Sequence, residues 1–240
     1  MLTSEDLREF AKKLQTNERN VVREYVQHLF LSDLYRHRGS RDLLFKGGTA
    51  LRLIYGSPRF SEDLDFTGRF YRPDRIEELL VRALGEVERT GVSIRLEEAK
   101  PTSGGYLAII NYRLFDYADA MHVEISMRKP KAGAAEVTTI VSEFMIPYTL
   151  YHLAPRDLVR EKVQALVQRG KPRDYYDVYF LLRHPALNRF IDKGKLDRVQ
   201  DLLDRERIDF RKELQLFLPV SHHAILKNFR GVLKKEISGY

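Results

Sequence analysis

One stretch of the chain carries two adjacent glycines and, shortly after them, two aspartates separated by one residue. Leu43–Phe45 is a short apolar run that predicts a strand, and Lys46–Thr49 follows it as a glycine turn. Ala50–Tyr55 predicts a short helix, which Gly56 ends. A polar loop then leads to a second predicted strand, Asp63–Thr67. This order of elements predicts a mixed α/β segment.

Asp63 and Asp65 are two residues apart, so on a strand both carboxylates leave the same face, while Leu64 and Phe66 point into the core. Two carboxylates about 7 Å apart along a strand repel each other unless a cation lies between them. A divalent ion with oxygen ligands resolves this repulsion, and Mg²⁺ usually keeps water molecules and substrate phosphates as its other ligands. Two surface acids at a strand end are the alternative interpretation.

The glycine turn has the composition of a phosphate-binding loop. Gly47 and Gly48 have no Cβ, so their backbone N–H groups can approach a phosphate closely. The Thr49 hydroxyl can donate to the phosphate or cap the helix, and Lys46 adds positive charge. Neither the P-loop spacing nor Gly-x-Gly-x-x-Gly is present. A Gly-Gly turn alone is common, but its combination with a nearby Asp-x-Asp strand favours a phosphate and metal site.

Glu124 is the candidate third acid. In the predicted strand around it, Val123 and Ile125 face one way, whereas His122, Glu124 and Ser126 face the other. Glu124 could share the metal or act as general base for an attacking hydroxyl. A surface glutamate on a strand is the alternative.

The rest of the sequence predicts two lobes. Helical spacing fills residues 1–40, a helix begins at Pro73, and strands are predicted at 92–96, 106–114, 121–127 and 137–141. From Pro155 the pattern is helical, with one predicted helix running from Phe210 to the C-terminus. We therefore expect an α+β fold, in which an α/β lobe over 1–150 precedes a helical lobe over 151–240, with the active site between them.

Charge is distributed unevenly between these lobes. The chain has 41 Lys and Arg against 34 Asp and Glu, a formal net charge of +7. Residues 1–150 carry 22 basic and 22 acidic side chains, whereas residues 151–240 carry 19 and 12. A basic surplus confined to one lobe indicates a polyanionic partner such as nucleic acid. A solvated, arginine-rich helical surface would give the same count.

The helical lobe contains a second charged motif, Arg160–Lys162 followed by Arg169–Asp177. Lys162, Arg173 and Arg169 could hold triphosphate oxygens, the arginines by bidentate contacts. Asp174 and Asp177 lie on one helical face. The alternative is a salt-bridged helical hairpin, in which Asp174 only orients Lys162 or Arg173.

Taken in order, these motifs resemble those of the AbiEii/MenT nucleotidyltransferase toxins, a toxin–antitoxin family within the DNA polymerase β-like superfamily. The resemblance covers residues 40–185. It implies that Asp63 and Asp65 bind Mg²⁺ (or Mn²⁺), that Gly48 and Thr49 contact an NTP, and that Lys162 and Asp174 are required for activity. The candidate catalytic residues are Asp63, Asp65, Glu124, Lys162 and Asp174; the metal ligands are Asp63, Asp65 and Glu124; and the NTP-binding residues are Lys46, Gly47, Gly48, Thr49, Ser61 and Arg173.

The expected function is therefore Mg²⁺-dependent transfer of an NMP from an NTP to an RNA acceptor. The resemblance implies the 3′ end of tRNA as acceptor, inhibition of translation and growth, and a cognate antitoxin encoded nearby. Transfer to a protein hydroxyl or a small molecule, and a non-catalytic scaffold, are the alternatives. The chain has no cysteine, no signal-peptide pattern and no apolar run long enough to cross a bilayer, so we expect a cytoplasmic protein with no membrane partner.

Overall fold

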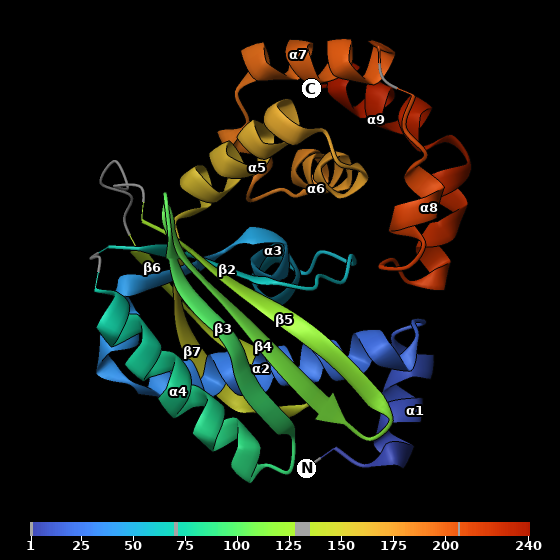
Figure 1. Ribbon diagram of the computed structural model, residues 1–240. Helices are drawn as coiled ribbons and strands as arrows, with labels where there is room; N and C mark the ends of the chain where they lie inside the picture. The colour runs from blue at the N-terminus through green and yellow to red at the C-terminus, as the bar shows by residue number, and fades with distance from the viewer. Residues whose placement is uncertain (1, 70–71, 128–134, 206) are drawn as a thin grey trace. The chain divides into compact units, whose positions relative to one another are not determined.

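The computed structural model describes residues 2–69, 72–127, 135–205 and 207–240 (Figure 1). The chain divides into two compact units. Unit 1 consists of Met1–Gly56 and Phe60–Leu153, and unit 2 consists of Ser57–Arg59 and Ala154–Tyr240. In the described ranges, no helix combines the length and the apolar character needed to cross a membrane.

Unit 1 is built on a seven-stranded mixed sheet in the order β3-β4-β5-β2-β1-β7-β6. Its central strands β1 and β2 pair antiparallel, while β1 pairs parallel with β7 and β2 pairs parallel with β5. The two outer pairs, β3–β4 and β6–β7, are antiparallel. The strands are β1 (Leu43–Lys46), β2 (Leu64–Gly68), β3 (Ser93–Thr102), β4 (Gly105–Leu114), β5 (Tyr117–Ser126), β6 (Ala135–Ser142) and β7 (Met145–Leu153).

The helices of unit 1 begin where the sequence places capping residues. Thr3 forms a capping box with Asp6 at the start of α1 (Ser4–Lys13), and the Asn17 side chain caps α2 (Glu18–Arg36). Gly56, in the left-handed conformation, ends α3 (Gly47–Tyr55). Helix α4 (Pro73–Arg89) begins with proline at its first position. A short 3₁₀ helix, η1 (Arg38–Asp42), leads into β1.

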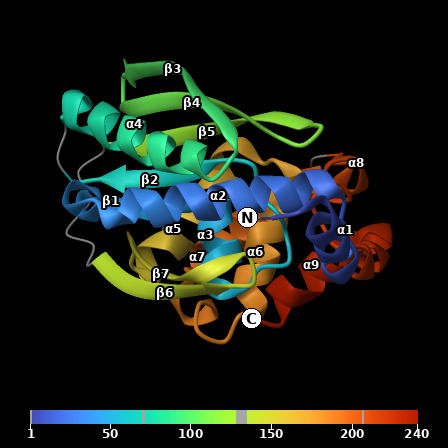
Figure 2. The same cartoon turned by 90° about the horizontal axis from the view of Figure 1, so that it is seen from below.

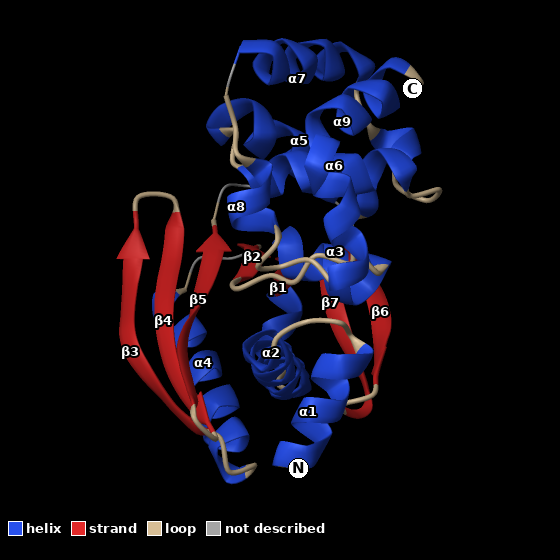
Figure 3. Cartoon of the chain, turned by 90° about the vertical axis from the view of Figure 1, so that its right-hand side faces the viewer, coloured by secondary structure: helices blue, strands red, loops and turns tan. Residues whose placement is uncertain are grey.

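Helix α2 is the centre of the unit 1 core. Figure 3 shows the sheet curving around it, and Figure 2 shows α4 beside it along β3–β5. Val22, Val26 and Phe30 of α2 are buried together with Phe66 and Ile125 of the sheet. Burying these apolar side chains is the main contribution to the stability of unit 1.

A buried polar pair lies within this core. His28 Nδ1 and the Tyr148 hydroxyl are 2.9 Å apart. Burial, and the charge of nearby Arg52, lower the pKa of His28 to about 4. The ring is therefore neutral at physiological pH.

Unit 2 is helical. It contains α5 (Pro155–Arg169), α6 (Pro172–Arg183), η2 (Asn188–Phe190), α7 (Lys193–Arg205), α8 (Phe210–Leu214), η3 (Val220–Asn228) and α9 (Phe229–Ser238). Gly170 adopts a left-handed conformation, with φ 58°, in the turn between α5 and α6. Phe210 and Phe229 pack edge to face with ring centroids 4.9 Å apart, and both contact aromatic rings of α6.

The predicted fold class is confirmed: a mixed sheet with flanking helices precedes a helical segment. Three details differ from the sequence-based expectation. Met145–Leu153, for which no strand is predicted from the sequence, forms β7. The single helix predicted from Phe210 to the C-terminus is wrong: the chain leaves α8 before Pro219, the N-cap of η3, and becomes α-helical again only at Phe229. Asp63 lies immediately before β2 rather than within it.

Candidate functional site

Three charged residues form a row across the central strands of unit 1. Lys46 on β1 pairs in register with Asp65 on β2, and Asp65 pairs with Glu124 on β5. Residues that pair directly across strands share one face of a sheet, so these side chains are neighbours. The next row along, Phe45–Phe66–Ile125, is buried on the opposite face. Asp65 is half-buried and Glu124 is exposed, so the row faces out of the core.

Gly47 fixes the position of the Asp65 carboxylate against the glycine turn. Its φ of +85° is a conformation that residues with a Cβ rarely adopt. A Cβ at this position would lie 2.0 Å from Asp65 Oδ2 and 2.8 Å from Asp65 Cβ. The backbone of the turn therefore packs directly on the aspartate, which only glycine permits.

The N-terminus of α3 begins at this same point. Lys46 is its N-cap residue, and no side chain caps the helix. The first N–H groups of a helix lack intrahelical acceptors, and with the helix dipole they favour an anion. The turn therefore combines a helix N-terminus with Lys46, beside the carboxylate of Asp65.

Thr49 holds the segment that carries the first aspartate. It is 1% exposed, and its hydroxyl donates to the backbone carbonyl of Asp63 at 2.6 Å. In the structure this hydroxyl donates to the Asp63 carbonyl and does not cap α3, while its contact with a phosphate stays a prediction. What Thr49 offers an anion is its backbone N–H in the first turn of α3.

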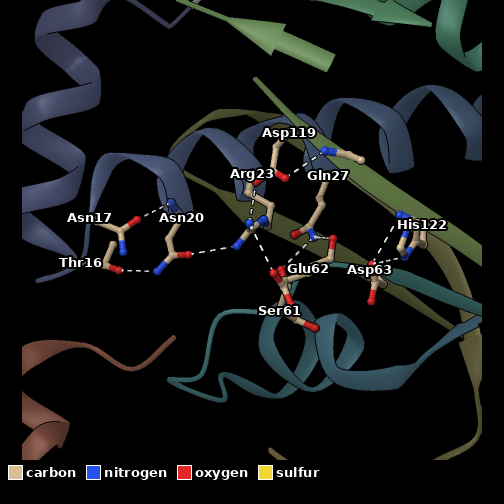
Figure 4. A network of polar contacts seen from close by, with 11 residues as sticks. Thr16, Asn17, Asn20, Arg23, Gln27, Ser61, Glu62, Asp63, Asp119 and His122 are labelled. Atoms are coloured by element: carbon tan, nitrogen blue, oxygen red, sulfur yellow. Dashed lines mark hydrogen bonds and ion pairs between the residues drawn. The ribbon is translucent and has the colours of Figure 1, made fainter. Parts of the chain in front are cut away.

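Helix α2 positions the loop before Asp63, as Figure 4 shows. Gln27 Nε2 donates to the carbonyls of Ser61 and Glu62, each at 3.0 Å. The Asp63 carboxylate itself lies 3.4 Å from His122 Nδ1 and from the His122 backbone nitrogen. Ser61 and Asp63 are therefore held by α2 and β5 on either side of the loop.

Arg52 of α3 forms an ion pair with α2. Its guanidinium pairs with the buried Glu24 of α2, with Nη2 3.2 Å from Oε1. It also lies over the ring of Phe60, 3.5 Å from the centroid. This largely buried ion pair holds α3, which begins at the glycine turn, against α2.

A pocket of about 360 Å³ opens beside the charged row. Lys46, Asp65 and Glu124 line it together with Thr102, Gly104 and Tyr106 at the β3–β4 turn. Gly105 allows the turn to approach, because a Cβ there would meet the Ile125 carbonyl oxygen at 1.9 Å. The row therefore borders a hollow, and is not a flat strand surface.

A buried charged cluster occupies unit 2. The Arg59 guanidinium donates to both oxygens of Asp177, at 2.9 and 3.1 Å, and Lys162 Nζ donates to Oδ2 of Asp177 at 2.7 Å. All three residues are less than a tenth exposed. Burial raises the pKa of Asp177, but the charges of Arg59 and Lys162 outweigh it and leave that pKa below its ordinary value.

Asp174 has a different partner. Arg169 holds it by two contacts, at 2.8 and 2.7 Å, and its carboxylate also accepts from the Lys171 backbone N–H at the start of α6. Of the two cations that the alternative interpretation gave to Asp174, Lys162 binds Asp177 instead, and Arg173 lies 3.9 Å from Glu213. Asp174 caps its own helix.

The comparisons with known proteins agree with this architecture. Residues 29–234 match the family described as nucleotidyl transferase AbiEii toxin of type IV toxin–antitoxin systems. The chain belongs to this family.

Individual relatives are distant in sequence. An uncharacterized protein of Aquifex aeolicus is 26% identical over 174 residues, covering 72% of this chain and 68% of that protein. MenT4, a nucleotidyltransferase toxin of Mycobacterium tuberculosis, superposes with a TM-score of 0.68 at 18% identity over 99% of this chain and 89% of its own. The crystal structure of a proposed nucleotidyltransferase from H. pylori gives a TM-score of 0.66 at 22% identity, over 92% and 94% of the two chains.

This AbiEii-family chain is therefore a nucleotidyltransferase, and a toxin whose system implies an antitoxin partner. Such enzymes use an NTP and a divalent metal, so we tested the residues against that requirement. Among the residues that the structure describes, no three His, Asp or Glu side chains form a ready-made metal cluster. Asp65 and Glu124 nevertheless share one pocket, with Asp63 close by in sequence. An all-carboxylate donor set suits Mg²⁺, whose remaining ligands are commonly water and phosphate.

The sequence predicted no role for Arg59, and it did not indicate that Asp177 is the partner of Lys162. Arg59 lies in a polar loop, 118 residues before its partner, and no local spacing indicates the pair. For Asp177 a signal existed, because it follows Asp174 by three residues and therefore shares its helix face. What the sequence did not show was which of these two aspartates binds Lys162.

Proposed function

We propose that this nucleotidyltransferase transfers an NMP from an NTP to the 3′ end of an RNA, with tRNA as the acceptor, in the cytoplasm and with Mg²⁺ (or Mn²⁺). The observation that carries the proposal is the Lys46–Asp65–Glu124 row beside the uncapped N-terminus of α3. It places Lys46 and a helix N-terminus beside two carboxylates that line a pocket of unit 1. We assign the metal ligands and the glycine turn to the lobe formed by residues 1–150, whereas residues 151–240 supply Lys162 and Arg173 for the triphosphate and further basic side chains for the acceptor.

In this proposal the glycine turn binds the triphosphate. The N–H groups of Gly47, Gly48 and Thr49 and the Lys46 ammonium attract phosphate oxygens, while Ser61 is held nearby through its carbonyl. Because Gly47 contacts Asp65, a phosphate on this turn lies next to that carboxylate. Asp65, Glu124 and Asp63 would hold the metal, which when bound supplies positive charge to the phosphates.

The transfer step is a displacement at the α-phosphorus. The acceptor hydroxyl oxygen forms a bond to that phosphorus, the bond to the β-phosphate oxygen breaks, and pyrophosphate leaves. Glu124, the exposed carboxylate of the row, is placed to accept the hydroxyl proton. Lys46 and the α3 N-terminus stabilise the charge that develops on the phosphate oxygens.

Unit 2 contributes Lys162, Arg173 and Asp174 to the proposal. Lys162 would bind the NTP, and Asp177 and Arg59 act as positioning residues, because they fix the Lys162 ammonium in one place. Asp174 supports the same helix through Arg169. The surplus of 19 basic over 12 acidic side chains in residues 151–240 supports a nucleic acid as acceptor.

The proposal is tested by incubating the protein with each α-labelled NTP, Mg²⁺ and total tRNA, and separating RNA from protein. We expect label in tRNA, lost when the metal is chelated and unaffected by addition of an unrelated protein. Label only in protein, or in a small acceptor, would replace the RNA acceptor with that class of substrate. No transfer from any NTP to any acceptor would overturn the proposal.

A further inference from the structure

Unit 1 contains a second pocket, larger than the one beside the charged row. It has a volume of about 480 Å³ and lies between η1 and the N-terminal half of α4. The side chains that matter for its chemistry are His37, Arg38, Arg72, Arg75, Leu79 and Arg82. None of these residues lines the pocket beside Asp65. The two hollows are therefore separate sites of one unit.

Arginine dominates the rim of this second pocket. Four arginines line it, against two acids, Asp42 and Glu78. Arg82 pairs with Glu78 at 2.6 Å, and Arg72 pairs with Asp74, which is outside the lining. Arg38 and Arg75 are exposed and form no ion pair within the described ranges. Two guanidinium groups thus remain for an anion, which they can bind by bidentate contacts.

The lining of this pocket also includes apolar side chains and one unsatisfied polar atom. Leu43, Ile76 and Leu79 supply the apolar surface, and Gly39 leaves room beside the Leu79 side chain. His37 Nε2 is buried and has no hydrogen-bond partner among the described residues. Buried polar atoms normally have a partner, so a small rotation of this ring toward a ligand would satisfy it.

We propose that this pocket binds a nucleoside monophosphate, either free or as one unit of an RNA chain. A pocket lined by both apolar side chains and arginines suits a nucleobase. Guanidinium planes stack on nucleobases, while their N–H groups bind phosphate. The volume falls in the range of pockets that enclose small organic ligands, and an inorganic phosphate would fill little of it.

Strand β1 connects this pocket to the charged row. Leu43, its first residue, lines the nucleotide pocket, and Lys46, its last, lines the pocket of the row. Three residue steps along a strand span about 10 Å. An RNA bound at the second pocket would therefore be held on unit 1 at a position distinct from the NTP. This inference concerns binding only and stands apart from the transfer reaction.

The test measures binding to the full chain without NTP, so that no transfer occurs. The probes are a fluorescent single-stranded oligo(A) RNA, AMP and inorganic phosphate. The variant is Arg38→Ala/Arg75→Ala, and the matched control is Arg89→Ala, an exposed arginine of α4 outside the lining. We expect the double variant to weaken both RNA and AMP binding about tenfold and to lower the salt dependence of RNA binding by about one to two counterions.

Each of the other outcomes either overturns the proposal or shows whether the ligand is a free nucleotide or part of an RNA. Loss of AMP binding with unchanged RNA binding identifies a free nucleotide as the ligand. Displacement of RNA by inorganic phosphate as effectively as by AMP would overturn the nucleoside assignment. Unchanged binding of both probes by the double variant, or equal loss in Arg89→Ala, would overturn the site. Because the experiment measures binding and not transfer, its result can be interpreted even if the proposed transfer reaction is not found.

Discussion

Two groups of carboxylates in this chain differ in the partners that surround them. In unit 1, Asp65 and Glu124 pair across neighbouring strands and line a pocket. In unit 2, Asp174 and Asp177 are each 1% exposed, and each binds an arginine by two contacts. In the sequence, Asp63 and Asp65 resemble Asp174 and Asp177, because each is a closely spaced pair of aspartates with basic residues nearby. The folded protein separates carboxylates that line a pocket from buried carboxylates that are already paired with cations, Asp174 with Arg169 and Asp177 with Arg59 and Lys162.

The difference shows which acids can do chemistry. A buried carboxylate that holds two cations, as Asp177 does, cannot bind a metal without leaving Arg59 and Lys162 uncompensated, which is costly in a low-dielectric interior. Asp65 and Glu124 instead line a pocket, in which a metal ion and its water ligands could reach them. We therefore expect substitutions in the first group to affect transfer, and substitutions in the second to affect folding.

The largest expected effect comes from Asp65→Asn. Removing this charge should lower the rate of nucleotide transfer by about 10³-fold or more, because the carboxylate that would hold the metal is lost. The free energy of unfolding should change by less than about 1 kcal/mol, because the side chain is only half-buried. Transfer rates and urea unfolding measure the two effects. A fully active variant would place the metal site elsewhere.

Asp177→Asn should show the opposite balance. It leaves two buried cations short of one counter-charge, so we expect a loss of about 3 kcal/mol in the free energy of unfolding. The control is Asp74→Asn, which breaks the exposed pair with Arg72 and should cost well under 1 kcal/mol. Equal stability of the two variants in urea would show that the buried cluster is not structural.

The acid sensitivity of the protein extends this comparison. The pKa of Asp177 is lower in the folded protein than its ordinary value of 3.8. Its contribution is therefore fully present above that ordinary value, and is lost as the pH falls through the lower folded value. Below about pH 4, wild-type stability should fall more steeply than that of Asp177→Asn, which has no such carboxyl to protonate. Parallel pH profiles would contradict the assignment.

Local signals predicted most of unit 1, since strands, capping residues and the glycine turn act over a few residues. The Glu124 register also followed from alternation along one strand, and its pairing with Asp65 is now observed. Strand β7 was missed because Met145–Leu153 could be recognised as a strand only through its pairing with β1 and β6. Asp63 lies outside β2 because its carbonyl bonds to Thr49, a contact across 14 residues.

The site in unit 2 was less predictable for the same reason. The charges of Lys162, Arg169 and Asp174 were evident, but which cation pairs with which acid depends on how α5 and α6 pack. Arg59 enters that cluster from a loop more than a hundred residues away along the chain. Ion pairs over such separations leave no periodic signal, so a sequence identifies the charged residues of a cluster more readily than its pairs.

The smallest expected change in transfer rate, and the sharpest test of the unit 1 site, comes from comparing Gly47→Ala with Gly56→Ala. Both glycines have positive φ, +85° and +74°, so each substitution should cost about 1 kcal/mol of backbone strain. A Cβ at Gly56 meets nothing within 4 Å, whereas one at Gly47 collides with the carboxylate and with Cβ of Asp65. Rotation of the carboxylate cannot relieve the second of these contacts, so β2 or the turn must move.

We therefore expect Gly47→Ala to lose at least about tenfold in transfer rate, because a displacement near 1 Å at a reacting site costs far more in rate than in stability. Gly56→Ala should retain transfer close to wild type at a similar urea midpoint. Because the two variants share the backbone penalty, their ratio of rates isolates the contact between the turn and Asp65. A ratio near one would mean that the glycine turn and the aspartate do not act together, and the charged row would then lose its link to the α3 N-terminus.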